Sequence, residues 1–159
     1  MRESVDGPKS KWMKEPLWAR LEIPLNTSRE NVWKALTLPE LTQKYMYNCR
    51  LHCNWGIGSP ANWKEVHKDG TTTTHVQGEL LEYNPYECLR FKIFHQLKII
   101  NGHVSELRFV LQHHEIGVLL LVEQGDFSSF PQAQEIYDEC VRSWNFIQND
   151  LISTCLLTS

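Results

Sequence analysis

The stretch that decides the fold is LEIPLNTSRENVWKALTLPELTQKYM, residues 21–46. Residues 17–25 alternate between apolar and polar side chains, and this period of two predicts a half-buried strand. Thr27 and Glu30 have the spacing of a capping box, in which two side chains satisfy free backbone N–H groups at the start of a helix. Pro39 suits the first turn of a second, shorter helix. The stretch therefore predicts a strand followed by two helices.

The chain after residue 48 has the character of a run of strands. Strand patterns cover residues 49–55, 71–83, 89–93, 107–111 and 118–122. Asp69-Gly70 and Asn101-Gly102 predict chain reversals between them, because glycine accepts the positive φ of tight turns. The last pattern is apolar on both faces, which favours either a central strand or one that is partly covered from outside.

The C-terminal part predicts one long amphipathic helix. Pro131 opens it, and apolar residues then recur at spacings of three and four. The residues assigned to its inner face are Ala133, Ile136, Tyr137, Cys140, Val141, Trp144, Ile147, Leu151, Ile152 and Cys155. The whole order of elements, without any internal repeat, predicts an α+β fold.

One motif points to a different architecture. Residues 56–61, GIGSPA, fit the dinucleotide-binding pattern G-x-G-x-x-G/A, and the acidic Glu79 follows about 20 residues later. That pattern requires a buried parallel strand before it and a helix after it. The flanking segments CRLHCNW and TTTTHVQGELLEY are too polar to be buried on both faces. We therefore interpret Gly56 and Gly58 as hairpin and bend glycines.

Composition narrows the class of protein. The 159 residues are 42% hydrophobic and 22% charged, which is typical of one globular domain. The net charge of −3 gives no reason to expect nucleic acid as a partner, and no apolar run is long enough to span a membrane. The five cysteines form no C-x-x-C pair and the first residues lack the apolar segment of a signal peptide. We expect a cytoplasmic protein with reduced thiols.

The domain boundary is predicted near residue 17. Residues 1–16 are polar, contain two prolines and show no periodicity, so we expect them to form a disordered N-terminal arm. Residues 17–159 are then expected to form a single domain.

Three motifs resemble those of the heat-shock protein 90 ATPase activator family. The first is V-W-x-A-L-T-x-P with an aromatic residue a few positions later, the second is a W-x-x-G-x-x-x-x-W-like hairpin, and the third is G-x-[VL]-x-E-x-x-P. The matching residues are Val32, Trp33, Ala35, Leu36, Thr37, Pro39 and Tyr45, then Trp55, Gly58, Ser59, Pro60 and Trp63, then Gly78, Glu79, Leu80, Glu82, Pro85 and Leu89. Ser143 stands before Trp144 where the family usually has glycine, and Gly125-Asp126-Phe127 replaces Ser-Gly-Phe. The resemblance covers residues 17–157.

This resemblance implies the helix-grip fold of the START-like, or SRPBCC, superfamily. In that fold a curved antiparallel sheet, here of about six or seven strands, wraps a long C-terminal helix, and two short helices follow the first strand. Members often hold lipids, sterols or other apolar molecules in a cavity between sheet and helix, and a minority perform chemistry there. The resemblance also implies a chaperone partner and a role in the stress response.

The residues themselves form no catalytic or metal-binding constellation. His113 and His114 are neighbours on a predicted strand, so they point to opposite faces and cannot share a metal ion. Cys140 has no base at a spacing that would make it a nucleophile. The remaining histidines, which lie among polar residues and are predicted to be on strand surfaces, are His52, His67, His75, His95 and His103. We expect no enzyme activity and no cofactor.

The inward-facing aromatic residues are candidates for the wall of a cavity, although for any single one of them a place in the core is the favoured interpretation. Tyr137 and Trp144 carry polar groups that need a partner when buried, and the smaller Cys140 and Val141 between them leave room for an apolar guest. The predicted cavity-lining residues are Trp33, Tyr45, Trp55, Trp63, Phe91, Phe109, Tyr137, Cys140, Val141 and Trp144.

Two functions stay open from the sequence. The first is non-catalytic binding of a small hydrophobic ligand between sheet and C-terminal helix. The second is a protein-interaction or co-chaperone-like module, with an interface at the N-terminal arm or on the sheet's outer face, where Leu119 and Leu121 are predicted to form an exposed apolar pair. A cyclase-like or hydrolase-like enzyme in the same cavity is a minor alternative. Both a monomer and a homodimer are compatible with the sequence.

Overall fold

The elements follow the order predicted from the sequence. The computed structural model describes residues 15–157, so most of the predicted N-terminal arm lies outside the described residues. The elements are β1 (Ala19–Leu25), α2 (Arg29–Thr37), α3 (Pro39–Thr42), β2 (Cys49–Cys53), β3 (Pro60–Val66), β4 (Thr72–Asn84), β5 (Cys88–Phe94), the 3-10 helix η1 (Lys98–Ile100), β6 (Val104–His114), β7 (Gly117–Gly125) and α4 (Ala133–Leu157).

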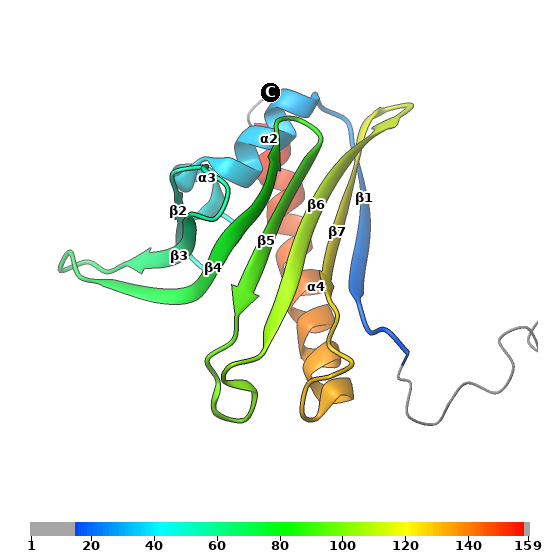
Figure 1. The fold of residues 1–159 in the computed structure, drawn as a ribbon. Helices are drawn as coiled ribbons and strands as arrows, with labels where there is room; N and C mark the ends of the chain where they lie inside the picture. Colours follow the sequence, from blue (N-terminus) through cyan, green and yellow to red (C-terminus); the bar gives the residue numbers. More distant parts are fainter. Residues whose placement is uncertain (1–14, 158–159) are drawn as a thin grey trace, which may run out of the picture.

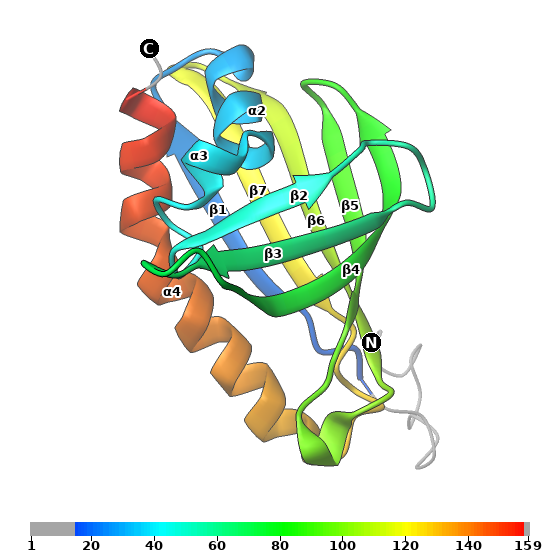
Figure 2. The same ribbon diagram turned by 90° about the vertical axis from the view of Figure 1, so that its left-hand side faces the viewer.

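The strands form one antiparallel sheet that curves around α4. Its order is β1-β7-β6-β5-β4-β3-β2, so β7 lies between β1 and β6 and the apolar run at residues 118–122 belongs to an interior strand. In Figures 1 and 2, α4 runs along the concave side of the sheet, and α2 and α3 lie at the end of the molecule near the C-terminus of α4. This arrangement is the predicted helix grip.

The start of α2 differs from the prediction by one residue. Its N-cap is Ser28, whose backbone is extended and whose Oγ accepts a hydrogen bond from the backbone N–H of Asn31 at 3.1 Å. Thr27 Oγ1 instead accepts one from the side-chain amide of Asn31, at 2.9 Å. The predicted Thr27 capping box is therefore wrong, because an adjacent hydroxyl residue occupies the cap position.

The glycine motif lies in the connection between β2 and β3, which confirms its interpretation as hairpin and bend glycines. Gly58 has φ of +87°, and its N–H donates to the carbonyl of Leu80 at 2.8 Å. A strand rather than a helix begins at Pro60, and β2 pairs antiparallel with β3. The strand–turn–helix unit that a dinucleotide requires is not formed here.

The two faces of the sheet differ in chemistry. Val118, Leu120 and Val122 face the core and are at most 1% exposed, whereas Leu119 and Leu121 are half-buried on the outer face rather than the exposed pair that was predicted. The outer face also carries a chain of alternating charges across five strands. Its ion pairs are Arg20–Glu123 at 2.9 Å, Arg108–Glu123 at 3.5 Å, Arg108–Glu106 at 2.7 Å, Arg90–Glu106 at 2.5 Å and Arg90–Glu82 at 2.8 Å.

Candidate ligand-binding groove

A groove runs between the N-terminal half of α4 and the concave face of the sheet. It consists of two adjoining pockets, of about 630 Å³ and about 460 Å³, which share His95, Leu97, Gln124, Ser143 and Trp144. We call the two pockets together the α4 groove. Besides the shared residues, the larger pocket is lined by Ile99, Ile100, Phe127, Gln132, Glu135, Ile136, Glu139 and Cys140, and the smaller by Met46, Tyr47, Trp63, Thr74, His75, Val76, Ile93, Phe94, Gln96, Leu107 and Ile147.

The α4 groove lies where no residue of the first turns of α4 is fully buried against the sheet. The buried residues of the helix begin at Trp144, and the preceding turns, residues 133–143, contain none. Two small side chains, Cys140 and Ser143, face the groove from this half. The mixture of apolar walls and a few polar groups is typical of small-molecule pockets.

A hydrogen-bonded chain of side chains lies along the groove, and all of its members except Ser105 line it. Trp144 Nε1 donates to Gln124 Oε1 at 2.9 Å, and Cys140 Sγ donates to the same oxygen at 3.4 Å. Gln124 Nε2 in turn donates to Ser105 Oγ at 3.2 Å, and Ser105 Oγ lies 2.8 Å from His95 Nε2. The chain therefore links α4 to the ends of three neighbouring strands.

Cys140 acts in this chain as a protonated donor. Burial raises the pKa of the Cys140 thiol to about 12, so the thiolate that a nucleophile or a metal ligand would need does not form near neutral pH. Among residues 15–157, no group of three or more histidine, cysteine, aspartate and glutamate side chains is arranged to hold a metal ion.

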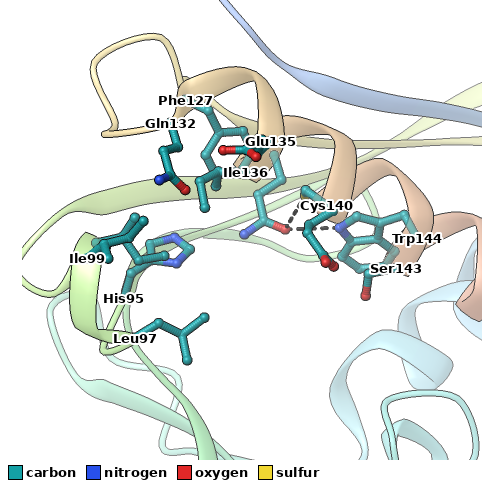
Figure 3. Close-up of a pocket in the computed structure, with 13 residues that line it drawn as sticks. His95, Leu97, Ile99, Phe127, Gln132, Glu135, Ile136, Cys140, Ser143 and Trp144 are labelled. Atoms are coloured by element: carbon teal, nitrogen blue, oxygen red, sulfur yellow. Dashed lines mark hydrogen bonds between the residues drawn. The ribbon is translucent and has the colours of Figure 1, made fainter.

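His95 lies in an aromatic setting rather than on an exposed strand surface, so that prediction is wrong for this residue. Its ring meets the edges of Phe127 and Phe130, with centroid distances of 6.2 and 5.2 Å. Burial lowers the pKa of the His95 imidazole, and the nearby His103 lowers it further, so the ring is neutral near pH 7. Figure 3 shows the ring across the open space from Cys140 and Trp144.

Tyr47 borders the α4 groove beside Ser143. The backbone of Tyr47 is left-handed, with φ of 51°, and its hydroxyl lies 2.9 Å from Ser143 Oγ. Its ring stacks on Phe146 with a centroid distance of 5.8 Å and an interplanar angle of 10°. Ser143 stands where glycine is usual in the proteins this chain resembles, so this contact depends on a departure from their pattern.

Three of the predicted cavity-lining residues lie in the α4 groove. Cys140 lines the larger pocket, Trp63 the smaller one and Trp144 both. Phe109 lies against Trp144, with ring centroids 6.0 Å apart, but it is 4% exposed and packed in the core.

Four other predicted residues lie in or against the main hydrophobic core. Trp33 and Trp55 both contact Tyr83, with centroid distances of 5.5 and 5.2 Å, and Phe91 packs edge-on against Trp63 at 5.0 Å. The hydroxyl of Tyr45 donates to the carbonyl of Ala35 at 2.8 Å, so its polar group is satisfied by protein. These rings pack in or against the main hydrophobic core, and none of the four lines the groove.

The last two predicted residues lie on other sides of α4. Tyr137 packs against a small cluster formed by Ile100, Phe127 and Phe130. Val141 faces β1, where a space of only about 10 Å³ remains. The apolar stripe of α4 is wider than the groove, so residues at the edges of the stripe contact other parts of the protein. Residues with the same helical spacing therefore have different neighbours.

The polar residues of this hydrogen-bonded chain were not predicted as part of the site, although the sequence carried a signal for them. Gln124 continues the inward phase of Val118, Leu120 and Val122 along β7. Ser105 and His95 likewise continue the inward phases of β6 and β5. A polar residue on the core phase of three adjacent strands, at the same end of the sheet, indicates a lined cavity rather than a dry core.

Comparison with known proteins identifies the family. Residues 26–154 match the model of the family described as Activator of Hsp90 ATPase homolog 1-like protein, and the chain belongs to that family. No match was found among curated proteins. No helix in the part of the chain that the structure describes is long and apolar enough to cross a membrane.

Solved structures share the fold at low sequence identity. A protein from Mesorhizobium loti is 20% identical with a TM-score of 0.70, covering 89% of this chain and 98% of its own. A protein from Cytophaga hutchinsonii is 23% identical with a TM-score of 0.63, covering 87% and 93%. The Aha1 dimer from Colwellia psychrerythraea is 14% identical with a TM-score of 0.65, covering 87% and 95%. At such identities the likeness concerns the fold alone.

Proposed function

We propose that this member of the Activator of Hsp90 ATPase homolog 1-like family binds a small, largely apolar molecule in the α4 groove without transforming it. The observation that carries the proposal is the hydrogen-bonded chain Trp144–Gln124–Ser105–His95, of which Trp144, Gln124 and His95 line an open groove with many apolar side chains in its walls. A pocket of several hundred cubic ångströms with few, well-placed polar groups is the usual form of a small-molecule site.

The test is binding of a neutral hydrophobic fluorescent probe, Nile red, together with native mass spectrometry of the purified protein for a co-purified molecule. Ser143→Trp should fill the α4 groove, because Ser143 lines both pockets. Arg142→Trp is the matched control, because it adds the same bulk at a neighbouring exposed position. Loss of probe binding in the first variant alone supports the proposal. A wild-type protein that takes up no probe and carries no small molecule contradicts it.

A co-chaperone-like interaction is the second candidate. It is supported by the description of the family and by two exposed apolar residues on the β5–β6 connection, Leu97 at 72% and Ile99 at 50%. On this hypothesis the protein raises the ATPase rate of a heat-shock protein 90, and replacing both residues by serine removes the effect. An ATPase rate that the wild-type protein does not change contradicts it.

A homodimer fits the second candidate, because the related Colwellia psychrerythraea structure is described as a dimer. Sedimentation velocity of the wild-type protein and of the Leu97→Ser, Ile99→Ser double variant distinguishes a monomer from a dimer formed through this connection. An unchanged dimer in the variant places the dimer interface elsewhere.

A further inference from the structure

The direction of each hydrogen bond along the groove follows from one residue. The indole N–H of Trp144 can only donate, so the atom of Gln124 that it meets is the carbonyl oxygen. The amide nitrogen of Gln124 must then donate to Ser105 Oγ. Ser105 is 4% exposed, and the acceptor within reach of its hydroxyl hydrogen is His95 Nε2, at 2.8 Å. His95 therefore carries its own hydrogen on Nδ1.

This Nδ1–H is available to a molecule in the groove. Nδ1 makes no hydrogen bond to any of the residues that the structure describes, and His95 lines both pockets of the α4 groove. The lowered pKa of His95 keeps the ring in the neutral form that this arrangement requires. His95 is half-buried, and a molecule that displaces water from this N–H leaves it without an acceptor unless it offers one itself, so a molecule with an acceptor at this point gains affinity over one without.

The charges around the groove disfavour an anionic molecule. Glu135 and Glu139 line the larger pocket from α4, and no lysine or arginine among the described side chains lines either pocket. Arg142 is directed to Glu139 at 3.2 Å and is exposed. A carboxylate bound here would face two carboxylates, whereas a neutral carbonyl would not.

We propose that the α4 groove selects a neutral apolar molecule that carries a carbonyl or similar hydrogen-bond acceptor, and that this acceptor binds the Nδ1–H of His95. The inference rests on the proposed function, since it names the class of molecule that the same groove takes. Trp144, Gln124 and Ser105 are positioning residues, because they hold the tautomer of His95.

Three naphthalenes of nearly equal size test the inference. They are 2-acetylnaphthalene, with a neutral acceptor, 2-ethylnaphthalene, with none, and 2-naphthoate, an anion, each titrated at pH 8. After each affinity is divided by the compound's hexane–water partition coefficient, the ketone should exceed the hydrocarbon by roughly two- to tenfold, which is the value of one neutral hydrogen bond. The naphthoate should have the lowest measured affinity of the three. Equal corrected affinities of ketone and hydrocarbon would overturn the inference.

Variants assign the effect to His95. His95→Phe should lower the affinity for the ketone roughly two- to tenfold and change the affinity for the hydrocarbon by less than about twofold, because only the donor is lost. His103→Phe is the matched control: it belongs to the same connection and its ring also contacts Phe130, at 5.1 Å, but it lines neither pocket. It should change neither affinity.

The outcomes separate the two proposals. If the naphthalenes bind but His95→Phe does not change the affinity for the ketone, the inference that an acceptor binds His95 is wrong, and the groove is still a binding site. If no naphthalene and no Nile red binds, the proposed function fails and the inference fails with it. If His95→Phe does not fold, nitrogen NMR of the His95 ring in the wild-type protein decides the question, because the ketone and not the hydrocarbon should shift the Nδ1–H signal.

Discussion

The two halves of α4 differ in what lies opposite them. In the C-terminal half, Ile147, Leu151 and Cys155 are 3%, 0% and 0% exposed, and α2 packs against the helix. Figure 2 shows α2 and α3 at this end. The N-terminal half has the same apolar spacing but contains no buried residue, and it borders the α4 groove.

This difference shows that apolar periodicity predicts which face of a helix points inward but does not predict what packs against that face. The apolar stripe continues along the whole helix, yet only the C-terminal half lies at the end of the molecule where α2 packs against α4 (Figure 2). Near the other half the sheet presents Gln124, Ser105 and His95 in place of large apolar side chains. Four predictions test this contrast, in order of decreasing expected effect.

The largest effect is expected for Leu151→Ala in the packed half. Leu151 is fully buried, so removing its side chain should lower the free energy of unfolding by about 2–5 kcal/mol, as measured by urea denaturation. Ile136→Ala, at a half-buried position beside the groove, should cost less than about 1.5 kcal/mol. Equal losses would mean that the two halves are packed alike.

Two neighbouring residues should respond differently to the same added bulk. Val141→Phe faces the narrow space at β1 and should destabilise the protein by about 1–3 kcal/mol while probe binding continues. Cys140→Phe points into the larger pocket and should change stability by less than about 1 kcal/mol while blocking the probe. The reverse pattern would place the open space on the β1 side of α4.

Trp144→Phe tests the boundary between the halves. The ring still packs against Phe109, but the donor to Gln124 Oε1 is lost, so the cost should be about 1 kcal/mol. In denaturation experiments, Phe109→Leu serves as the comparison, because it alters packing and leaves the hydrogen bond intact. A cost for Trp144→Phe above about 3 kcal/mol would show that the indole has a larger packing role than its position suggests.

The smallest effect is a pH dependence from His95. Its pKa is lower in the folded protein than the unperturbed value of about 6.5, so the unfolded chain binds the proton more readily. The stabilising contribution is therefore complete above pH of about 6.5 and is lost as the pH falls from there towards the folded pKa. The groups around the ring are His103 on the same connection and Glu135 and Glu139 across the groove.

The measurement is the difference in unfolding free energy between wild type and His95→Phe as a function of pH. The wild-type protein should lose stability relative to the variant as the pH falls below about 6.5. A difference that does not change with pH would show that the ring titrates alike in the folded and unfolded states.

Much of the fold followed from local patterns. Alternation at residues 17–25, proline at the start of α3 and the turn glycines each act over a few residues, so they can be interpreted without tertiary information. The same holds for Gly58, whose positive φ serves a hairpin. The cap of α2 was misassigned by one residue because Thr27 and Ser28 can both cap a helix, and the spacing from Thr27 to Glu30 outweighed the better capping ability of serine.

The sequence by itself determined the order of the elements and the alternation of inward and outward side chains along most strands, because strand phase is a property of the local chain. Only the tertiary structure decided which of these residues meet one another and where space is left. Trp33, Tyr45 and Phe91 are packed in the main core, while Trp144 reaches Gln124 beside an open groove. The spacing between α4 and the sheet depends on contacts between residues far apart in the chain, and no local period encodes that distance.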